Sequence, residues 1–315
     1  MKSEIRKISV AIPIYNEREN IPILVEKLKE VLEGMGYEWE IVFGDNASND
    51  GSFEILKELH EGDRRIKVVR LSKNFGQTGS LSAALDYASG DVVITMDGDL
   101  QNDPADIPLF LDKIKEGYDI VSGWRYERKD PLTKRIPSKI YNWLASKLTG
   151  VKLHDFGCTF KAMRREVVKN LRLYGEMHRY IEALASEMGV RIAEIKVRHH
   201  PRKYGKTKYG ASRILKGFLD LLTVKFLLSY STRPLHLFGI PGLILTALGV
   251  ITGGYLTFQW FMGASIWGRP LLLLAILLVI VGVQFVAIGL LAEMIVRSYY
   301  ESTGKKIYYV KEILK

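Results

Sequence analysis

The sequence predicts an α/β domain with a doubly wound, mainly parallel sheet, followed by two transmembrane helices. Between residues 7 and 97, short apolar strands alternate with amphipathic helices, which is typical of right-handed βαβ units. Further along, residues 234–268 and 270–292 contain no Asp, Glu, Lys or Arg. A spanning helix needs about 20 apolar residues, so both segments are long enough to cross a bilayer.

The elements of the α/β domain can be assigned in order. Residues 7–15 (KISVAIPIY) are expected to form a strand, because apolar and β-branched residues dominate them. Residues 20–36 have the amphipathic pattern of a helix and close with glycine, which commonly ends helices. The same alternation then predicts, in order, a strand at 38–45, a helix at 52–62, a strand at 66–72, a helix at 77–90 and a strand at 91–97.

Acidic side chains follow three of these strands. Glu17 comes after the first strand, Asp45 ends the second, and Asp97 ends the last, with Asp99 and Asp103 close behind. The carboxyl ends of parallel strands meet at one edge of a sheet, where α/β proteins bind ligands, so these groups are expected to converge. Oxygen ligands of this kind suit Mg²⁺ or Mn²⁺ bound together with a diphosphate.

Each acidic segment also has a purely structural interpretation. Asp-Gly is a common turn pair, and residues 45–51 (DNASNDG) could be a capped turn before the next helix. Neither a dinucleotide-binding GxGxxG motif nor a P-loop follows the first strand. The occurrence of acidic residues at three strand ends is what favours a metal and nucleotide site over isolated turns.

A basic segment separates the α/β domain from the transmembrane helices. Residues 196–216 contain eight Lys or Arg and no Asp or Glu, and the chain has a formal net charge of +10. The next residues, up to 232, are apolar with few charges and are expected to form an interfacial helix on the bilayer. The basic segment could bind an anionic acceptor or be attracted to acidic lipid in general. Two membrane spans argue against nucleic acid as a partner.

The charges around the two spans predict their orientation. Basic residues flank the outer ends of the pair, whereas Arg269 is the one charged residue between the spans. By the positive-inside rule, both termini and the α/β domain are cytoplasmic and the protein lies in the cell membrane. The tail KKIYYVKEILK (305–315) could add a strand or helix to a neighbouring subunit of a homo-oligomer. Cys158 is the single cysteine, so no internal disulfide forms, and it is expected to be a packed core thiol.

Several motifs, taken in order, resemble the GT-A fold of glycosyltransferase family two. They are IPIYNE (12–17), FGDNASNDGS (43–52), MDGDLQ (96–101) and VSGWR (121–125). The resemblance is greatest to polyprenyl-phosphate glycosyltransferases, such as dolichyl-phosphate mannose synthases and undecaprenyl-phosphate glucosyltransferases. It continues through DFGCTFKAMRREV (155–167), MHRYI (177–181) and RKYGKTKYG (202–210). It implies a GT-A catalytic domain over 1–210, an amphipathic helix over 211–232, two transmembrane helices over 233–296 and a cytoplasmic tail over 297–315.

The resemblance also implies roles for individual residues. The nucleoside of the donor would be bound by Pro13, Tyr15, Glu17 and Asp45. Asp97 would face the ribose and diphosphate, Asp99 and Gln101 would ligate the metal, and Asp155 would lie near the reacting centre. The phosphate of the acceptor would be held by Arg125, Lys134, Arg135, Ser138, Arg202 and Lys208.

The implied reaction is transfer of a hexose from a nucleotide-diphosphate sugar, of the UDP-glucose or GDP-mannose type, to undecaprenyl or dolichyl phosphate. A phosphate monoester has a second pKa near about 6, so the acceptor is largely a dianion at neutral pH and needs no general base. The enzyme would supply positioning and neutralise charge, and a single displacement would invert the anomeric carbon. A processive polysaccharide synthase, a catalytically silent scaffold and a sugar-nucleotide sensor are the alternatives.

Overall fold

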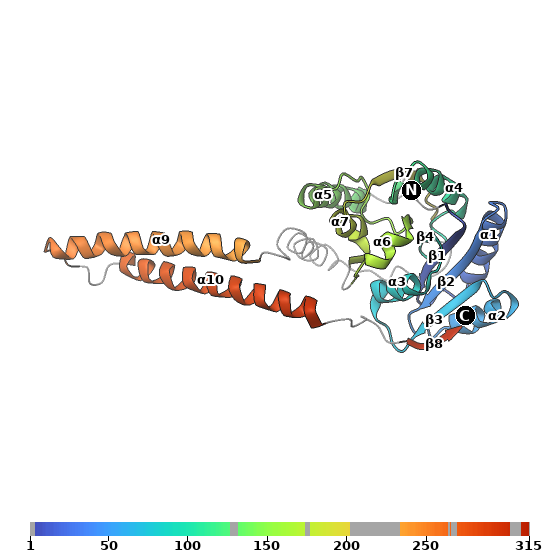
Figure 1. The fold of residues 1–315 in the computed structure, drawn as a ribbon, viewed down its shortest axis with the longest axis horizontal. Coiled ribbons are helices and arrows are strands. Elements are labelled where there is room, and N and C mark those ends of the chain that lie inside the picture. The colour runs from blue at the N-terminus through green and yellow to red at the C-terminus, as the bar shows by residue number, and fades with distance from the viewer. Residues whose placement is uncertain are drawn as a thin grey trace. The chain divides into compact units, whose positions relative to one another are not determined.

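The computed structural model describes residues 4–126, 132–173, 177–201, 234–263, 265, 270–302 and 310–314. The chain divides into two compact units (Figure 1). The first comprises Met1–Val224 together with Lys306–Lys315, and the second comprises Lys225–Lys305. The expected interfacial helix over 211–232 lies outside the described residues.

The first unit is built on an eight-stranded sheet with the order β7-β5-β6-β4-β1-β2-β3-β8. Its strands are β1 (Lys7–Ile14), β2 (Glu38–Asp45), β3 (Ile66–Leu71), β4 (Val92–Thr95), β5 (Ile120–Arg125), β6 (Lys161–Arg164), β7 (Ile192–Val197) and β8 (Val310–Leu314). The strand pairs β1–β2, β1–β4, β2–β3 and β5–β7 are parallel. Strand β6 runs antiparallel to β4 and β5, and β8 runs antiparallel to β3. The predicted mainly parallel α/β sheet is therefore confirmed.

Helices cover both faces of this sheet. The first four are α1 (Ile21–Glu33), α2 (Ser52–Gly62), α3 (Gly76–Tyr87) and α4 (Ile107–Lys115). They are followed by α5 (Leu132–Thr149), α6 (Arg165–Asn170) and α7 (Ile181–Ser186), and short 3₁₀ turns form η1 (Pro104–Asp106) and η2 (Met177–Tyr180). Each element predicted up to residue 97 is present, with ends shifted by a few residues at most.

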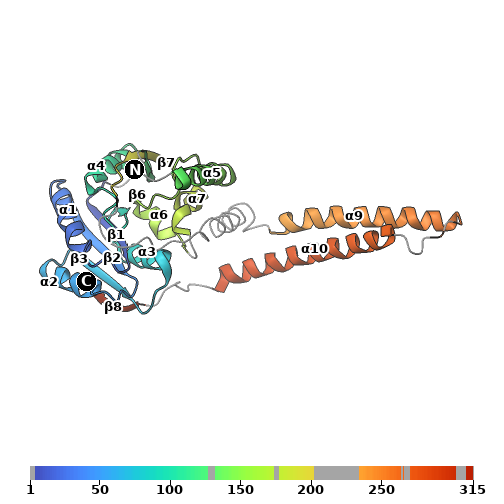
Figure 2. The same cartoon turned by 180° about the vertical axis from the view of Figure 1, so that it is seen from behind.

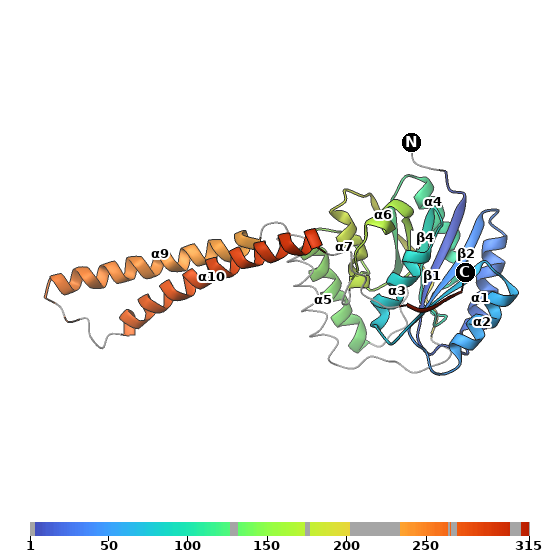
Figure 3. The same cartoon turned by 60° about the horizontal axis from the view of Figure 1, so that its bottom comes forward.

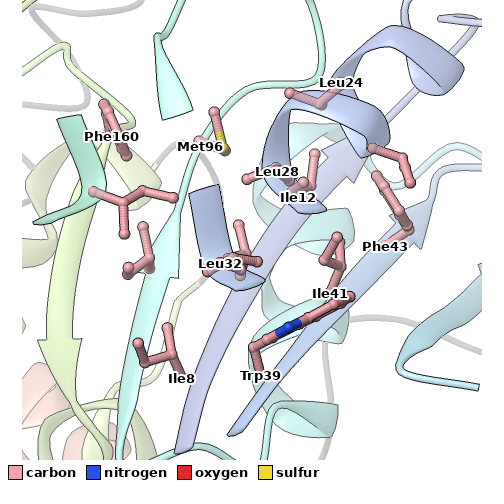
Figure 4. Packing of buried hydrophobic residues seen from close by; sticks show 14 of the residues in the cluster. Ile8, Ile12, Leu24, Leu28, Leu32, Trp39, Ile41, Phe43, Met96 and Phe160 are labelled. Carbon is pink, nitrogen blue, oxygen red and sulfur yellow. The ribbon is translucent and has the colours of Figure 1, made fainter. Parts of the chain in front are cut away.

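The main core lies between the sheet and the helices α1, α2 and α4. It takes every second residue of β1 from Ile8 to Ile14, as the two-residue period of a strand requires. Leu24, Leu28 and Leu32, spaced four apart on α1, face these strand residues (Figure 4). Each fully buried leucine contributes about 2 kcal/mol of transfer free energy, so truncating Leu28 to alanine would cost about 2–5 kcal/mol.

Helix α3 lies against β1, β2 and β3 (Figure 3) and approaches β2 very closely. A Cβ atom on Gly44 would lie 2.2 Å from the carbonyl oxygen of Ser80, so a larger residue has no room here. The Ser80 hydroxyl donates a hydrogen bond to the Gly44 carbonyl at 2.5 Å. Small residues along α3 permit this approach, which brings the first turn of α3 to the carboxyl ends of the strands.

Strand β8 comes from the C-terminal tail and closes one side of the sheet (Figure 1). It pairs from Val68↔Leu314 to Leu71↔Val310, with an irregularity between Arg70 and Leu71. From the sequence, this tail is expected to be a separate segment that could join a neighbouring subunit. In the structure it pairs with β3 of its own chain and so covers N–H and C=O groups that would otherwise lie at a sheet edge.

The second unit contains α9 (Pro234–Phe261) and α10 (Pro270–Ser302), which lie side by side (Figures 1 and 2). The segments Phe238–Phe261 and Pro270–Ala292 are long and apolar enough to span a membrane. Their most apolar windows are only 22% and 11% buried, so their apolar side chains face outward, unlike those of a core helix. The helices approach through glycine: a Cβ on Gly282 would lie 2.6 Å from the carbonyl oxygen of Gly242.

Candidate active site

The carboxyl ends of β1, β2 and β4 bring the predicted acidic segments to one edge of the sheet. Ile14, the last residue of β1, is in register with Asp45, the last of β2. Ala11 of β1 is in register with Thr95, the last of β4. The segments after these strands contain Tyr15 and Glu17, residues 46–51, and residues 96–103, and they therefore start at the same edge.

The loops after β1 and β2 are joined by hydrogen bonds. The backbone N–H of Asn16 donates to the Ser48 hydroxyl at 3.0 Å, and that of Glu17 donates to the Ser52 hydroxyl at 3.0 Å. Asn16 has a left-handed backbone with φ of 54°. A hollow of about 320 Å³ beside these loops is lined by Asn16, Glu17, Arg18, Glu19, Asn20 and Asp50. Part of the polar sequence after the strands thus serves to fix the loops.

Asp45 is a fully buried carboxylate with incomplete compensation. Its Oδ1 accepts the backbone N–H of Ser48 at 3.1 Å, whereas Oδ2 has no hydrogen-bond partner among the described residues. The nearest cation is Arg70, whose Nε lies 3.6 Å from Oδ2. Burial raises the pKa of Asp45 above its ordinary value. The free acceptor oxygen suits an N–H donor on a ligand.

Asp97 accepts hydrogen bonds from two neutral side chains that are not among the predicted site residues. Gln77, in the first turn of α3, donates to Oδ1 at 2.8 Å, and the Thr159 hydroxyl donates to Oδ2 at 2.6 Å. Thr159 belongs to the segment DFGCTF that carried the family resemblance, so that motif was the available signal. Gln77 had none, because its contact depends on the close approach of α3 to the sheet.

Asp99 and Gln101 lie in the same tight turn after β4. Asp99 is 5% exposed, and its Oδ1 accepts the backbone N–H of Gln101 at 3.1 Å. Leu100 between them has a φ of 62°, a left-handed conformation that is rare and strained for leucine. A Cβ on Gly98 would lie 2.4 Å from Cδ1 of Ile14, so the turn packs closely against the side chain that ends β1. The strained turn directs two oxygen-bearing side chains from neighbouring positions.

Asp103, the third carboxylate of this loop, anchors the loop to residues that follow β7. Its Oδ2 lies 3.0 Å from Nε2 of His200 and 3.4 Å from Nη1 of Arg198. Burial alone would raise the pKa of Asp103, but the hydrogen bond from His200, that from Ala105 and the charge of Arg198 lower it. The backbone N–H of His200 donates to the Gln101 carbonyl at 2.9 Å. The loop with Asp99, Gln101 and Asp103 is therefore hydrogen-bonded to the start of the basic segment (196–216).

The partly buried Arg125 and the buried Asp155 form a bidentate pair. Nε and Nη2 of Arg125 donate to the two carboxylate oxygens of Asp155 at 2.7 and 2.8 Å. Burial alone would lower the pKa of Arg125, but the hydrogen bonds and charge of Asp155, with a smaller effect of Asp97, raise it. Arg125, Asp155 and Asp97 are thus brought together. One edge of the guanidinium, formed by Nε and Nη2, therefore already faces a carboxylate.

The loop that carries Asp155 is fixed from two sides. Glu194 of β7 accepts the backbone N–H groups of His154 at 2.8 Å and Asp155 at 3.1 Å. Asn142 of α5 donates to the His154 carbonyl at 2.8 Å. Ser138 lies one helical turn before Asn142, so this contact brings the helix with Ser138 to the Asp155 loop.

The side chains of four predicted acceptor residues lie outside the described part of the structure. Arg202 and Lys208 lie outside the described residues, as do the side chains of Lys134 and Arg135, whose backbone belongs to α5.

Cys158 is buried, and burial raises the pKa of its thiol to about 11. A thiol with such a pKa is protonated at neutral pH, which agrees with the predicted core role.

Comparison with known proteins identifies relatives over the whole chain. A dodecaprenyl-phosphate galacturonate synthase from Rhizobium johnstonii is 40% identical over 313 residues. The match covers 98% of this chain and 93% of that protein. An undecaprenyl-phosphate 4-deoxy-4-formamido-L-arabinose transferase from Shewanella sediminis is 36% identical over 310 residues, covering 98% and 92%.

Solved structures show the same fold at low identity. Glucosyl-3-phosphoglycerate synthase from Mycobacterium tuberculosis, crystallised with Mn²⁺, UDP-glucose and phosphoglyceric acid, is 21% identical with a TM-score of 0.53, and the match covers 70% of this chain and 80% of that one. The same enzyme was also crystallised with Mg²⁺ and UDP, with a TM-score of 0.51 over 69% and 79%. These neighbours are GT-A enzymes, which confirms the predicted fold.

The family model for glycosyl transferase family 2 matches residues 9–172, which is more than half of the chain. This stretch includes the turn with Asp99 and Gln101, the buried Asp45 and the Arg125–Asp155 pair. With these motifs, its GT-A sheet and its full-length relatives, the chain is a glycosyltransferase that belongs to glycosyl transferase family 2.

Proposed function

We propose that this chain transfers one sugar from a nucleotide-diphosphate sugar to a polyprenyl phosphate, with inversion at the anomeric carbon. The observation that carries the proposal is the edge of the sheet where Asp45, Asp97 and the Asp99–Gln101 turn meet next to the Arg125–Asp155 pair. The names of the two relatives, which include dodecaprenyl phosphate and undecaprenyl phosphate, support this class of acceptor.

The donor would bind at the ends of β1, β2 and β4. Pro13, Tyr15, Glu17 and Asp45 would contact its nucleoside, and the free acceptor oxygen of Asp45 supports this assignment because a base offers N–H donors. Asp97, oriented by Gln77 and Thr159, would face the ribose and the diphosphate. A ligand N–H would offset the desolvation that now raises the pKa of Asp45.

Asp99 and Gln101 fit a Mg²⁺ or Mn²⁺ ion. Both offer oxygen atoms, and the Leu100 conformation presents them from two positions on either side of it in a tight turn. Among the described residues, no cluster of three or more His, Cys, Asp or Glu side chains could hold a metal, so the ion would rely on donor phosphates to complete its shell. When bound, it would neutralise charge on the leaving diphosphate.

The acceptor phosphate would bind near Arg125, Ser138, Lys134, Arg135, Arg202 and Lys208. Because Asp155 occupies one edge of the Arg125 guanidinium, we assign the remaining N–H donors of Arg125 to the phosphate. Asp155 would then fix the direction of this side chain. These groups would orient an acceptor oxygen in line with the anomeric carbon and reduce repulsion between two phosphate-bearing substrates.

We infer that α9 and α10 cross the membrane as a hairpin, with the catalytic domain and both termini in the cytoplasm. The pairing of β8 with β3 supports the placement of both termini on the same side of the membrane, because it joins residues before and after the hairpin in one sheet. The proposed segments are the catalytic domain over 1–210, an interfacial helix over 211–232, the spans over 233–296 and a tail over 297–315 that includes β8. Protease applied outside sealed cells should spare the catalytic domain.

The test is incubation of the full chain with undecaprenyl phosphate and a panel of donors, followed by mass spectrometry of the lipid. UDP-glucose and GDP-mannose test the predicted hexoses, and UDP-galacturonate and a UDP-4-amino-4-deoxy-L-arabinose derivative test sugars like those in the relatives' names. We expect one glycosyl unit per lipid and a nucleoside diphosphate, with NMR showing the opposite anomer. Long glycan products would indicate a processive synthase, and no product with any donor would contradict the proposal.

A further inference from the structure

Most polar side chains described in the candidate spans are satisfied within their own helix. In α9, the hydroxyls of Thr246, Thr252 and Thr257 donate to the carbonyl oxygens four residues earlier at 2.8 to 2.9 Å. Gln259 donates to the Tyr255 hydroxyl at 2.6 Å. This is expected, because hydrocarbon offers no hydrogen bonds and an unsatisfied polar group there is costly.

Gln284 of α10 does not follow this pattern. It lies well inside the span Pro270–Ala292, and roughly 12 Å of helix separates it from the Ala292 end. Its side chain is exposed, and its carboxamide makes no hydrogen bond with any residue that the structure describes. A carboxamide has two N–H donors and an oxygen acceptor, so α10 presents a strongly polar group to the centre of the bilayer.

Gln284 faces away from α9. Gly282 and Val286 form the contact with α9, because both come within 3 Å of a Cβ built on Gly242. Gln284 lies two residues after Gly282, which is about 200° around an α-helix. On its outward face, the other large side chains are apolar and exposed: Leu277, Ile280, Ile288 and Leu291. Ala287, also exposed, leaves room for close approach of another helix.

We propose that this outward face of α10, centred on Gln284, binds the same face of a second copy of the chain. Around a two-fold axis, each Gln284 can donate one N–H to the carbonyl oxygen of the other, so each carboxamide uses its oxygen and one of its two N–H donors. Lipid tails and a polyprenyl chain have no such group. The apolar residues on either side of Gln284 would meet themselves, which makes the face self-complementary.

Cysteine cross-linking tests the contact directly. Cys158 is the single native cysteine, so the full-length Cys158→Ser protein gives a clean background. We expect Ala287→Cys, which lies on the same face and keeps Gln284, to form a disulfide-linked dimer in native membranes upon mild oxidation. Val286→Cys, at similar depth but facing α9, is the matched control and should remain monomeric on a non-reducing gel. Equal cross-linking of the two variants, or links from position 287 only to other proteins, would overturn the proposal.

A second measurement separates the hydrogen bond from general stickiness. Full-length protein in nonionic detergent should self-associate, and Gln284→Leu should weaken association about tenfold, as for loss of interhelical hydrogen bonds in membranes. Gln259→Leu removes a carboxamide that its own helix already satisfies and should leave association unchanged. Monomeric wild type, or equal effects of the two variants, would contradict the proposal. No donor or acceptor is present, so the result is independent of the proposed transfer reaction.

Discussion

The two ends of the catalytic sheet both contain buried carboxylates, but these carboxylates differ in their hydrogen-bond and ion-pair partners. At the amino end, Glu40 of β2 is 1% exposed. It accepts hydrogen bonds from the Ser9 hydroxyl and the Ser89 backbone at 2.6 Å, and it pairs with Lys7 at 2.8 Å and Lys67 at 2.7 Å. Burial alone would raise the pKa of Glu40, but these partners lower it to about 2.

At the carboxyl end, compensation by the chain is incomplete. Burial raises the pKa of Asp45, whose Oδ2 lacks a hydrogen bond among the described residues. Asp97 has the neutral partners Gln77 and Thr159, and Asp99 accepts a backbone N–H. Glu40, paired with two lysines and hydrogen-bonded, stabilises the fold, whereas Asp45, which has a single cation 3.6 Å away and one oxygen without a hydrogen bond among the described residues, favours binding of a ligand that donates to it. The comparison thus distinguishes a carboxylate with a structural role, at the amino end of the sheet, from carboxylates with a proposed binding role at the carboxyl end.

The largest expected effect is at the carboxyl end. Asp99→Asn should reduce turnover about 1000-fold while leaving the thermal unfolding temperature nearly unchanged, because it removes charge from a proposed ligand but few packing contacts. Steady-state rates and thermal scans of the full chain measure both effects. Asp112→Asn, on an exposed carboxylate of α4, is the control and should be neutral. Excess chelator should also abolish turnover; full activity in chelator would show that no metal is needed.

Glu40→Gln should have the opposite profile. The folded pKa of about 2 lies below the ordinary 4.5, so ionised Glu40 stabilises the fold at neutral pH by about 3 kcal/mol. This contribution is present above pH 4.5 and is lost as the pH falls toward 2. Denaturant unfolding at pH 7 and at lower pH should show the gap between wild type and variant closing. The control is Glu33→Gln, which removes an exposed partner of Arg65 and should change the free energy of unfolding little. An equally small change for Glu40→Gln would contradict a structural role of this carboxylate.

Arg125→Lys tests the pair that lies between these extremes. Lysine cannot reproduce the two parallel hydrogen bonds to Asp155, so transfer in uncharged detergent should fall about tenfold or more, with a smaller change in donor affinity. Initial rates at varied donor and acceptor concentrations distinguish the two. Arg191→Lys, which removes an exposed guanidinium stacked on Tyr118, should be nearly silent. Full activity of Arg125→Lys would place the acceptor phosphate elsewhere.

Asp103→Asn should have the smallest effect. If Asp103 only anchors the loop to His200 and Arg198, the variant should need severalfold more Mn²⁺ for half-maximal rate, yet reach a similar rate at saturation. A Mn²⁺ titration of the initial rate measures this. A loss that saturating Mn²⁺ does not restore would mean that Asp103 acts on the substrates or metal directly, and the division between anchoring and functional carboxylates would have to be redrawn.

The sequence by itself determined the architecture and the edge where the site lies. The alternation of apolar strands and amphipathic helices follows directly from the periods of the two structures, and the register of parallel strands then forces their carboxyl ends together. Asp45, Asp97, Asp99 and Gln101 could therefore be assigned to one edge before any contact was known. The two uncharged segments likewise predicted helices of membrane-spanning length, because length and composition alone decide that property.

Only the tertiary structure decided which groups partner those side chains. The bond of Gln77 to Asp97, the fastening of Asp103 by His200 and the pairing of Arg125 with Asp155 join residues 20 to 97 positions apart. Strand β8 joined its own sheet although the whole hairpin separates it from β3. Contacts of this kind depend on how closely elements pack and which way a side chain points, and no local period in the sequence encodes either.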